Sequence, residues 1–313
     1  MSAINLFPAP LDRAGDLRAD SNALDSLWLR AKIARVHAGR IAANENEITY
    51  LSSQGVSELI ESHSLELGER YFLGIDRATD TPYFAWDTSA VDDLLSDDVK
   101  NEGMKSLREL GHVFDINSIQ IAMHAIALAN WHEAHPRCSR CGAQTIVGFG
   151  GAVRTCIEDQ SQHHPRTDSA VIVLIKDVQN RILLGHQPMW PDGRFSTFAG
   201  FLEPGETFEQ CVEREVFEES GVALSDITYL GSQPWPFPAS IMIAFEAVAV
   251  DPENARPDGE EITEVRWFSK AELKSATLDG SLLLPPSISV ARKMIAGWYG
   301  EGADQLDGGQ TWR

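Results

Sequence analysis

The stretch Gly200–Val222, GFLEPGETFEQCVEREVFEESGV, decides the fold of the C-terminal part of this chain. It predicts a tight loop, GFLEPGE, that leads into a helix carrying Glu215, Glu218 and Glu219 at positions i, i+3 and i+4. Like charges this close destabilise an isolated helix. A divalent cation such as Mg²⁺ or Mn²⁺, which favours oxygen ligands, is the expected counter-charge. The alternative is a solvated acidic face, and the adjacent Arg214 and the glycine-containing loop argue against it.

The spacing of this stretch matches the Nudix box, G-x5-E-x7-R-E-U-x-E-E-x-G-U, in which U is aliphatic. The matching residues are Gly200, Glu206, Arg214, Glu215, Val216, Glu218, Glu219, Gly221 and Val222. The chain therefore resembles the Nudix hydrolases. The resemblance implies metal-assisted cleavage of a diphosphate that is linked to a second group.

A second motif, SQPWPFPAS, occupies residues 232–240. Its prolines alternate with aromatic residues, which predicts a stiff wall with flat apolar faces that can pack against a heteroaromatic ring. Gln233 and Ser240 have side chains that can hydrogen-bond the edge of such a ring or a ribose. The segment resembles the SQPWPFPxS signature of the NADH pyrophosphatase subfamily. The alternative is a proline-rich loop without a role in ligand binding.

A third motif, CSRCG at residues 138–142, predicts a zinc-knuckle turn in which two thiolates reach one metal ion. Cys156 follows, and Asp159 stands where a second Cys-x-x-Cys pair would place its last thiolate. Zinc also accepts carboxylate and imidazole ligands, so Asp159, His163 or His164 is the candidate for the remaining position. The alternative is a ribbon that has lost its metal and folds on packing alone.

The three motifs together resemble the NADH pyrophosphatase subfamily over residues 131–295, and the resemblance implies a role for each matching residue. The implied catalytic and Mg²⁺- or Mn²⁺-binding carboxylates are Glu215, Glu218, Glu219 and Glu261, supported by Arg214 and Glu206. The implied substrate-binding residues are Phe201, Gln233, Pro234, Trp235, Pro236, Phe237, Pro238, Ala239, Ser240 and Ala291. The candidate zinc ligands are Cys138, Cys141, Cys156 and Asp159, and the aspartate departs from a pattern of four cysteines. His164 falls where relatives have a tyrosine or phenylalanine that reaches across a dimer interface.

The activity that the resemblance implies is hydrolysis of the pyrophosphate bond of NADH or NAD⁺ to AMP and nicotinamide mononucleotide. Removal of NAD caps from RNA 5′ ends would use the same bond and pocket. One alternative is a broader nucleoside-diphosphate hydrolase acting on substrates of the ADP-ribose type. Another is a non-catalytic nucleotide sensor, which predicts the loss of a box carboxylate, and all of them are present.

The length leaves room for two or three domains, and the mixture of predicted strands and helices indicates an α+β protein. The 313 residues, 43% hydrophobic and 23% charged, have an ordinary globular composition. We expect an N-terminal, mainly β domain (1–116), a helix with a zinc-ribbon-like segment (117–166), a Nudix α/β/α sandwich (167–300) and a loose tail (301–313).

The net charge of −20 disfavours nonspecific binding to polyanions. No apolar run reaches the length of a membrane span, and the start lacks a secretory pattern. Cysteines spaced for metal ligation are typical of a reducing compartment, so we expect a cytoplasmic protein without a membrane partner. The subfamily resemblance adds the expectation of a homodimer.

Local patterns predict most elements. Residues 26–86 read mainly as strands, and Asn117 can cap a helix over Ser118–Trp131. The C-terminal strands are expected at 170–175, 181–187, 227–231, 241–250 and 264–268. Ser269 and Glu272 predict a capping box, and Ser287 the start of a last helix. Cys211 reads as a buried thiol. We expect a poorly ordered start at 1–20 and a solvated acidic segment at 91–102.

Overall fold

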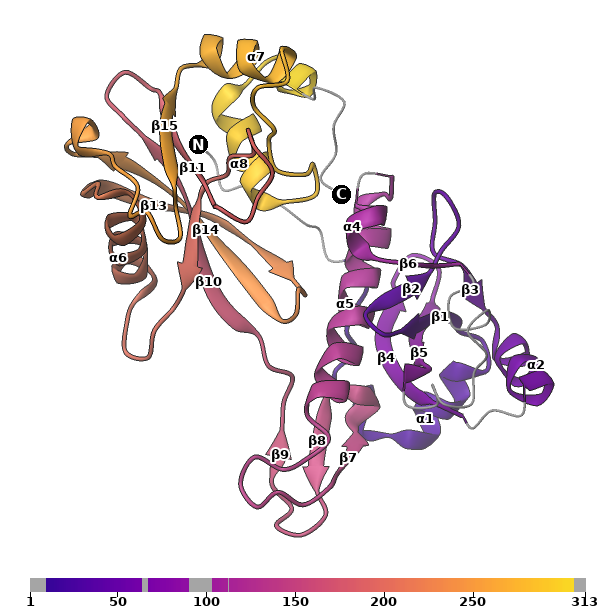
Figure 1. Ribbon diagram of the computed structural model, residues 1–313. Coiled ribbons are helices and arrows are strands. Elements are labelled where there is room, and N and C mark those ends of the chain that lie inside the picture. Colours follow the sequence, from indigo (N-terminus) through magenta and orange to yellow (C-terminus); the bar gives the residue numbers. More distant parts are fainter. Residues whose placement is uncertain (1–9, 64–66, 90–102, 112, 307–313) are drawn as a thin grey trace. The chain divides into compact units, whose positions relative to one another are not determined.

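The computed structural model describes residues 10–63, 67–89, 103–111 and 113–306, which divide into two compact units (Figure 1). The N-terminal unit holds the described part of Phe7–Thr167 together with Pro236–Ala239. The C-terminal unit holds the described part of Asp168–Trp235 and Ser240–Arg313. The fold class is α+β, as predicted, because each unit combines a mixed sheet with helices.

A sheet with the strand order β4-β5-β1-β2-β6 forms the centre of the N-terminal unit, and β3 pairs with β1. Its strands are β1 (Lys32–His37), β2 (Arg40–Ala42), β3 (Tyr50–Leu51), β4 (Glu69–Asp76), β5 (Thr81–Asp87) and β6 (Met104–Lys105). Its helices are α1 (Ser21–Trp28), α2 (Ser53–His63), α4 (Leu107–Leu110) and α5 (Ile116–Ala134). A separate three-stranded ribbon contains β7 (Thr145–Gly148), β8 (Val153–Cys156) and β9 (Gln162–His163).

The C-terminal unit has a sheet with the order β13-β14-β10-β11-β15, and β12 pairs with β10. Its strands are β10 (Asp168–Lys176), β11 (Ile182–His186), β12 (Phe198–Phe201), β13 (Leu224–Trp235), β14 (Ser240–Ala249) and β15 (Glu264–Phe268). Its helices are α6 (Phe208–Ser220), α7 (Lys270–Leu278) and α8 (Val290–Tyr299). Both α6 and α8 contact β10, whose residues are buried on both faces, so the sheet lies between helices (Figure 1).

The two units repeat one topology. Among the described elements, the series β1, β2, β3, α2, β4, β5, β6, α4 and α5 has the same order of strands and helices as β10, β11, β12, α6, β13, β14, β15, α7 and α8, and the sheets share the same strand order. In each unit the first and fifth strands of this series are parallel, whereas the other pairs are antiparallel. The α6 helix in the C-terminal unit therefore corresponds to α2 in the N-terminal unit.

The α6 helix begins and ends where its sequence predicts. Thr207 and Gln210 form a capping box, with Gln210 N donating to Thr207 Oγ1 at 3.2 Å and Thr207 N to Gln210 Oε1 at 2.8 Å. Gly221 ends the helix in the left-handed region at φ +68°. Val212 and Val216 are fully buried against the sheet, and Cys211 beside them is the predicted buried thiol.

Three elements differ from the prediction. The 26–86 segment contains α2, in which Val56, Leu59 and Ile60 pack on the core at helical spacing, so a reading as mainly strands was wrong there. The cap of α5 is Asp115 instead of Asn117, because the Asp115 carboxylate accepts from two backbone N–H groups. The last helix begins after Ser289 instead of at Ser287.

The apolar α5 helix is buried inside the N-terminal unit, where it contacts the sheet. Within the described ranges, no helix combines the length and apolar character that a bilayer crossing requires. The predicted acidic segment at 91–102, residues 1–9 of the predicted start and residues 307–313 of the predicted tail lie outside the described residues. Ala303–Leu306 form a 3-10 turn in which Leu306 is buried.

Candidate functional site

Gly200 and Glu215 bring β12 and α6 into close contact. A Cβ atom added to Gly200 would lie 1.8 Å from the carboxyl carbon of Glu215, closer than two non-bonded atoms can approach. Only glycine therefore allows the Glu215 carboxylate to lie over the strand. This contact explains why a glycine begins the motif and a glutamate lies fifteen residues further on.

Arg214 ties the loop and the helix together. Its guanidinium donates to Glu206 at 2.6 and 2.9 Å, to Glu215 Oε1 at 2.8 Å and to Glu218 Oε2 at 3.1 Å. A further bond at 3.0 Å reaches the backbone oxygen of Phe201 at the end of β12. These hydrogen bonds lower the pKa of Glu206 to about 2, so this carboxylate is ionised at neutral pH. Arg214 therefore orients the three carboxylates that it contacts.

Glu219 is the most unusual group of the site. It is 4% exposed, and its Oε2 has no hydrogen-bond partner among the described residues. Burial, followed by the charges of Glu215, Glu261 and Asp258, raises its pKa to about 8, while the backbone N–H of Ala199 opposes the shift. Burial also raises the pKa of Glu215. A buried carboxylate among like charges needs a cation to be ionised at neutral pH.

The loop between β14 and β15 brings Glu261 to the same cluster. Asp258 accepts hydrogen bonds from the backbone N–H groups of Glu261 at 3.0 Å and of Ile262 at 2.8 Å. Sequence reasoning named Glu261 and missed Asp258. The sequence feature that could have identified Asp258 is the Pro-Asp-Gly turn at 257–259. An aspartate in such a turn often accepts hydrogen bonds from the backbone that follows it.

The structure gives the predicted substrate residues different environments. Phe201 is 59% exposed, so its ring is free to stack on a planar group. Gln233 is fully buried, and its amide bonds the backbone of Ile288 (2.8 Å) and Val290 (2.6 Å) at the start of α8. Both of its polar atoms are thus used inside the protein, which differs from the expectation of a direct ligand contact. Ala291 is also buried.

The other residues of the 232–240 motif follow the hairpin between β13 and β14. Pro234 and Trp235 are the last residues of β13, and Ser240 is the buried first residue of β14. Pro236, Phe237, Pro238 and Ala239 form the turn between the two strands, which belongs to the N-terminal unit. His164 is exposed and directly follows β9.

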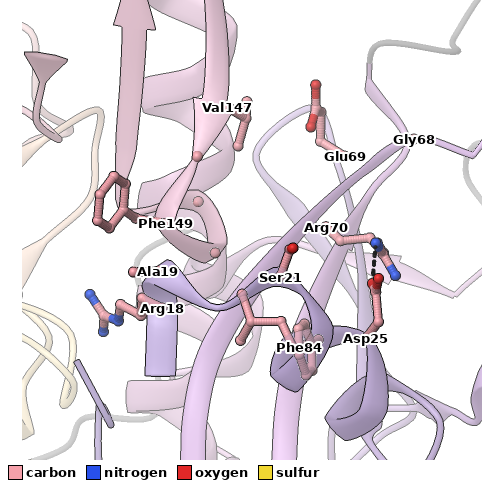
Figure 2. Close-up of a pocket in the computed structure, with 14 residues that line it drawn as sticks. Arg18, Ala19, Ser21, Asp25, Gly68, Glu69, Arg70, Phe84, Val147 and Phe149 are labelled. Atoms are coloured by element: carbon pink, nitrogen blue, oxygen red, sulfur yellow. Dashed lines mark hydrogen bonds and ion pairs between the residues drawn. The ribbon is translucent and has the colours of Figure 1, made fainter. Parts of the chain in front are cut away.

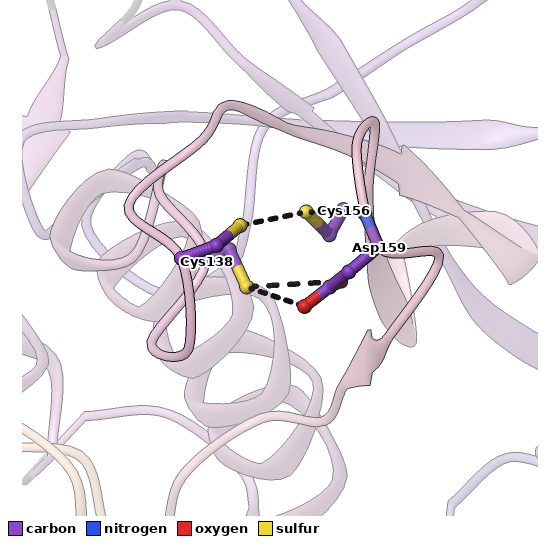
Figure 3. Close-up of side chains that lie close together, drawn as sticks. Cys138, Cys156 and Asp159 are labelled. Atoms are coloured by element: carbon purple, nitrogen blue, oxygen red, sulfur yellow. Dashed lines mark hydrogen bonds between the residues drawn. The ribbon is translucent and has the colours of Figure 1, made fainter.

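The ribbon gathers the four predicted zinc ligands. Ligand atoms of Cys138, Cys141, Cys156 and Asp159 all lie within 4.8 Å of one another (Figure 3). Thiolates around a tetrahedral zinc ion are about 3.8 Å apart for Zn–S bonds of about 2.3 Å. The Cys141 and Cys156 sulfurs are 3.5 Å apart, and the Cys138 sulfur lies 3.8 Å from Asp159 Oδ2. The cluster thus has the size and ligand chemistry of a zinc site.

His132 of α5 anchors the ribbon, a role that sequence reasoning missed. Its Nε2–H donates to Gly151 O at 2.8 Å, Arg154 donates to its Nδ1 at 2.9 Å, and its ring stacks on Tyr71. Burial lowers its pKa to about 4, so it is neutral at pH 7, as both bonds require. The sequence feature that could have indicated this role is the Trp131-His132 pair shortly before the cysteines.

A separate pocket of about 300 Å³ lies in the N-terminal unit (Figure 2). It is lined by residues of α1, β4 and β5 and by the glycine-rich turn at 148–151. Arg70, one of its two arginines, forms an ion pair with Asp25 at 2.9 Å. None of the residues that line it belongs to the predicted site.

The N-terminal copy of the fold lacks the carboxylate arrangement. The strand β3 of this copy consists of Tyr50 and Leu51, and Leu51 pairs with Ile33 of β1. Leu51 and Ile60 pack against the apolar core of that unit. Glu58 and Glu61 of helix α2 are exposed, so among the described residues the cluster around the buried Glu219 belongs to the C-terminal copy.

Comparisons with known proteins match both copies. A family profile described as "NUDIX domain" matches residues 166–284, and one described as "NADH pyrophosphatase-like rudimentary NUDIX domain" matches residues 31–131. The chain is 37% identical to the NAD-capped RNA hydrolase NudC of Mycobacterium bovis, over 92% of each protein. The NudC of Mycobacterium tuberculosis shows the same identity and coverage. The NAD-capped RNA hydrolase NUDT12 of Homo sapiens is 36% identical over 57% of this chain and 41% of its own.

Proposed function

The chain belongs to the Nudix hydrolases, in the family of the NAD-capped RNA hydrolases, and on this premise we propose that it cleaves the pyrophosphate bond of NAD. The substrates are NADH or NAD⁺, which give AMP and nicotinamide mononucleotide, and RNA that carries NAD at its 5′ end. The observation that supports this most is Glu219, a buried carboxylate with an unpartnered oxygen beside Glu215 and Glu261.

The residues of the cluster fit a divalent cation. Glu215, Glu218, Glu219 and Glu261 would hold Mg²⁺ or Mn²⁺, because carboxylate oxygens are the ligands that these ions prefer. The cation would neutralise charge on the pyrophosphate and lower the pKa of the attacking water. The unpartnered oxygen of Glu219 and the raised pKa of this group are the expected signs of such a site.

The chain's own residues orient the reaction. Arg214 holds the Glu215 and Glu218 carboxylates, and Glu206 fixes the guanidinium through two bonds. Glu218 and Glu261 are exposed enough to take a proton from water, and both are candidates for the general base. The exposed ring of Phe201 would stack on adenine, and Gln233 would keep the start of α8 in place.

The test is product analysis with NADH, NAD⁺, NAD-capped RNA and ADP-ribose in the presence of Mg²⁺ or Mn²⁺. We expect AMP and nicotinamide mononucleotide from the dinucleotides and a 5′-monophosphate on the RNA. Glu219→Gln should lose at least about 100-fold in kcat, because it removes a charge that holds the cation. Glu213→Gln, an exposed carboxylate of the same helix, is the matched control. Preference for ADP-ribose, or wild-type turnover in Glu219→Gln, would refute the proposal.

Zinc in the ribbon is a second part of the proposal. The ligand set Cys138, Cys141, Cys156 and Asp159 supports it, because three thiolates and a carboxylate suit tetrahedral zinc. Elemental analysis of the purified protein should give one zinc per chain. Asp159→Ala should lower this ratio, whereas well below one zinc in the wild type would favour a ribbon that folds on packing alone.

A homodimer in the cytoplasm completes the proposal. Exposed apolar side chains on the ribbon, Ile146 (60%), Phe149 (42%) and Ile157 (47%), support an interface between two copies. The four free cysteines support a reducing compartment. Light scattering of wild type and Ile146→Asp tests the dimer, and a monomeric wild-type mass would exclude it.

A further inference from the structure

Two of the three ribbon thiols are placed close together. The sulfurs of Cys141 and Cys156 are 3.5 Å apart. Cys138 instead faces Asp159 and Ser161, at 3.8 and 3.5 Å. A disulfide has an S–S length of about 2.05 Å, so this pair needs to close by about 1.5 Å.

We propose that Cys141 and Cys156 form a modification site that a peroxide oxidises to a disulfide, with release of the metal from the ribbon. The disulfide follows from the placement of the two sulfurs alone. The release of metal rests on the zinc site proposed above, because zinc binding needs thiolates and the disulfide removes two of its four ligands.

The chemistry balances with hydrogen peroxide as the oxidant. The Cys141 sulfur attacks one peroxide oxygen, the O–O bond breaks, and the second oxygen leaves as water after protonation. Cys141 is then a sulfenic acid. The Cys156 sulfur attacks it, the S–S bond forms, and the hydroxyl leaves as water. Two thiols and one peroxide give one disulfide and two waters, and the two electrons lost by sulfur reduce the peroxide.

Exposure assigns the order of these steps. Cys141 is exposed, whereas Cys156 is fully buried, so peroxide reaches Cys141 first and Cys156 resolves the sulfenic acid. Asp159 occupies the fourth position with a carboxylate, which does not oxidise. With cysteine at that position, a second thiol pair would be available next to Cys138. The aspartate therefore limits the cluster to one favoured disulfide.

The experiment uses the full chain loaded with zinc and treated with hydrogen peroxide. A chromogenic chelator follows zinc release, and alkylation with peptide mapping identifies the thiols. We expect one zinc released for each Cys141–Cys156 disulfide, and recovery after a dithiol reductant and zinc are added. Cys141→Ser should abolish this disulfide and slow zinc release at least tenfold. Cys211→Ser, which removes the fully buried thiol of the C-terminal unit, is the matched control and should behave as wild type.

Peptide mapping of the wild type keeps the test decisive even where a variant fails to fold or binds no zinc. The metal-free wild type should give the same disulfide. A Cys138–Cys141 disulfide, sulfinic or sulfonic acids without a disulfide, or zinc release at the wild-type rate from Cys141→Ser would overturn the proposal. None of these readouts depends on hydrolysis of NAD, so they remain informative where the proposed activity fails.

Discussion

The Glu215 carboxylate lies where the Cβ atom of any side chain at residue 200 would be, so one added carbon atom changes the geometry of the site. We therefore expect Gly200→Ala to displace Glu215 and to lower kcat about 100-fold or more, since a shift of about 1 Å in a catalytic group has effects of this size. Steady-state kinetics with NADH measures the change. Gly148→Ala is the matched control, because a Cβ there meets no atom within 4 Å. Equal activity of the two variants would contradict this account of the glycine.

Glu219 makes the stability of the metal-free protein depend on pH. Its pKa of about 8 in the folded state lies above its ordinary value of 4.5, so the folded protein binds the proton more tightly than the unfolded chain. Stability should therefore fall as pH rises from about 4.5 to 8, by roughly 2–4 kcal/mol. Chemical denaturation in the presence of a chelator measures this slope. Glu219→Gln should remove it, and a slope that persists in this variant would assign it to another group.

At the scale of elements, the start of helix α8 is held in place by a side chain of strand β13. Gln233 of β13 donates to the Ile288 carbonyl and accepts from the Val290 N–H. Gln233→Leu should leave both groups unpaired and lower the free energy of unfolding by about 2–4 kcal/mol. Gln233→Glu keeps the acceptor for the Val290 N–H, so its free energy of unfolding should lie between those of wild type and Gln233→Leu. Equal stability of Gln233→Leu and wild type in thermal denaturation would refute the anchoring role.

The ribbon and α5 are linked through His132, whose pKa of about 4 lies below its ordinary value of 6.5. Between these values the unfolded chain binds a proton that the folded protein excludes. The N-terminal unit should therefore lose roughly 2–3 kcal/mol of stability as pH falls from 6.5 to 4. Hydrogen exchange at Gly151 and its neighbours measures the effect. His132→Gln should flatten the pH dependence, and an unchanged profile would refute the role of the imidazole.

The sequence predicts elements whose determinants are local. The α6 helix, its capping box and its Gly221 end follow from neighbouring residues, and the structure confirms them. The α2 helix was not predicted, because Val56, Leu59 and Ile60 span too few residues to distinguish the helical period from that of a strand. The partners of Gln233 lie more than fifty residues away, so no local pattern contains them. Asp258 was missed because its function is to hold the backbone of Glu261.

The whole molecule contains one strand order twice, and among the described residues the carboxylate cluster around Glu219 belongs to the C-terminal copy. In the N-terminal copy, Leu51 and Ile60 pack against the apolar core. The carboxylates of that copy's helix, Glu58 and Glu61, are exposed instead of gathered over the strand. The two copies thus share backbone topology and differ in chemistry.

Separate cores have a consequence for cooperativity. The apolar cluster around Val171 and Phe245 and the one around Ile33 and Phe84 have no residue in common. Two-state melting is a property of a single core, so a calorimetric scan should show two heat-absorption peaks. Mg²⁺ should move only the peak of the C-terminal unit, and acid should lower only the N-terminal one. A single peak that shifts as a whole would mean that the copies melt as one body. With two peaks, the N-terminal copy unfolds under conditions in which the C-terminal copy, which holds the carboxylate cluster, stays folded.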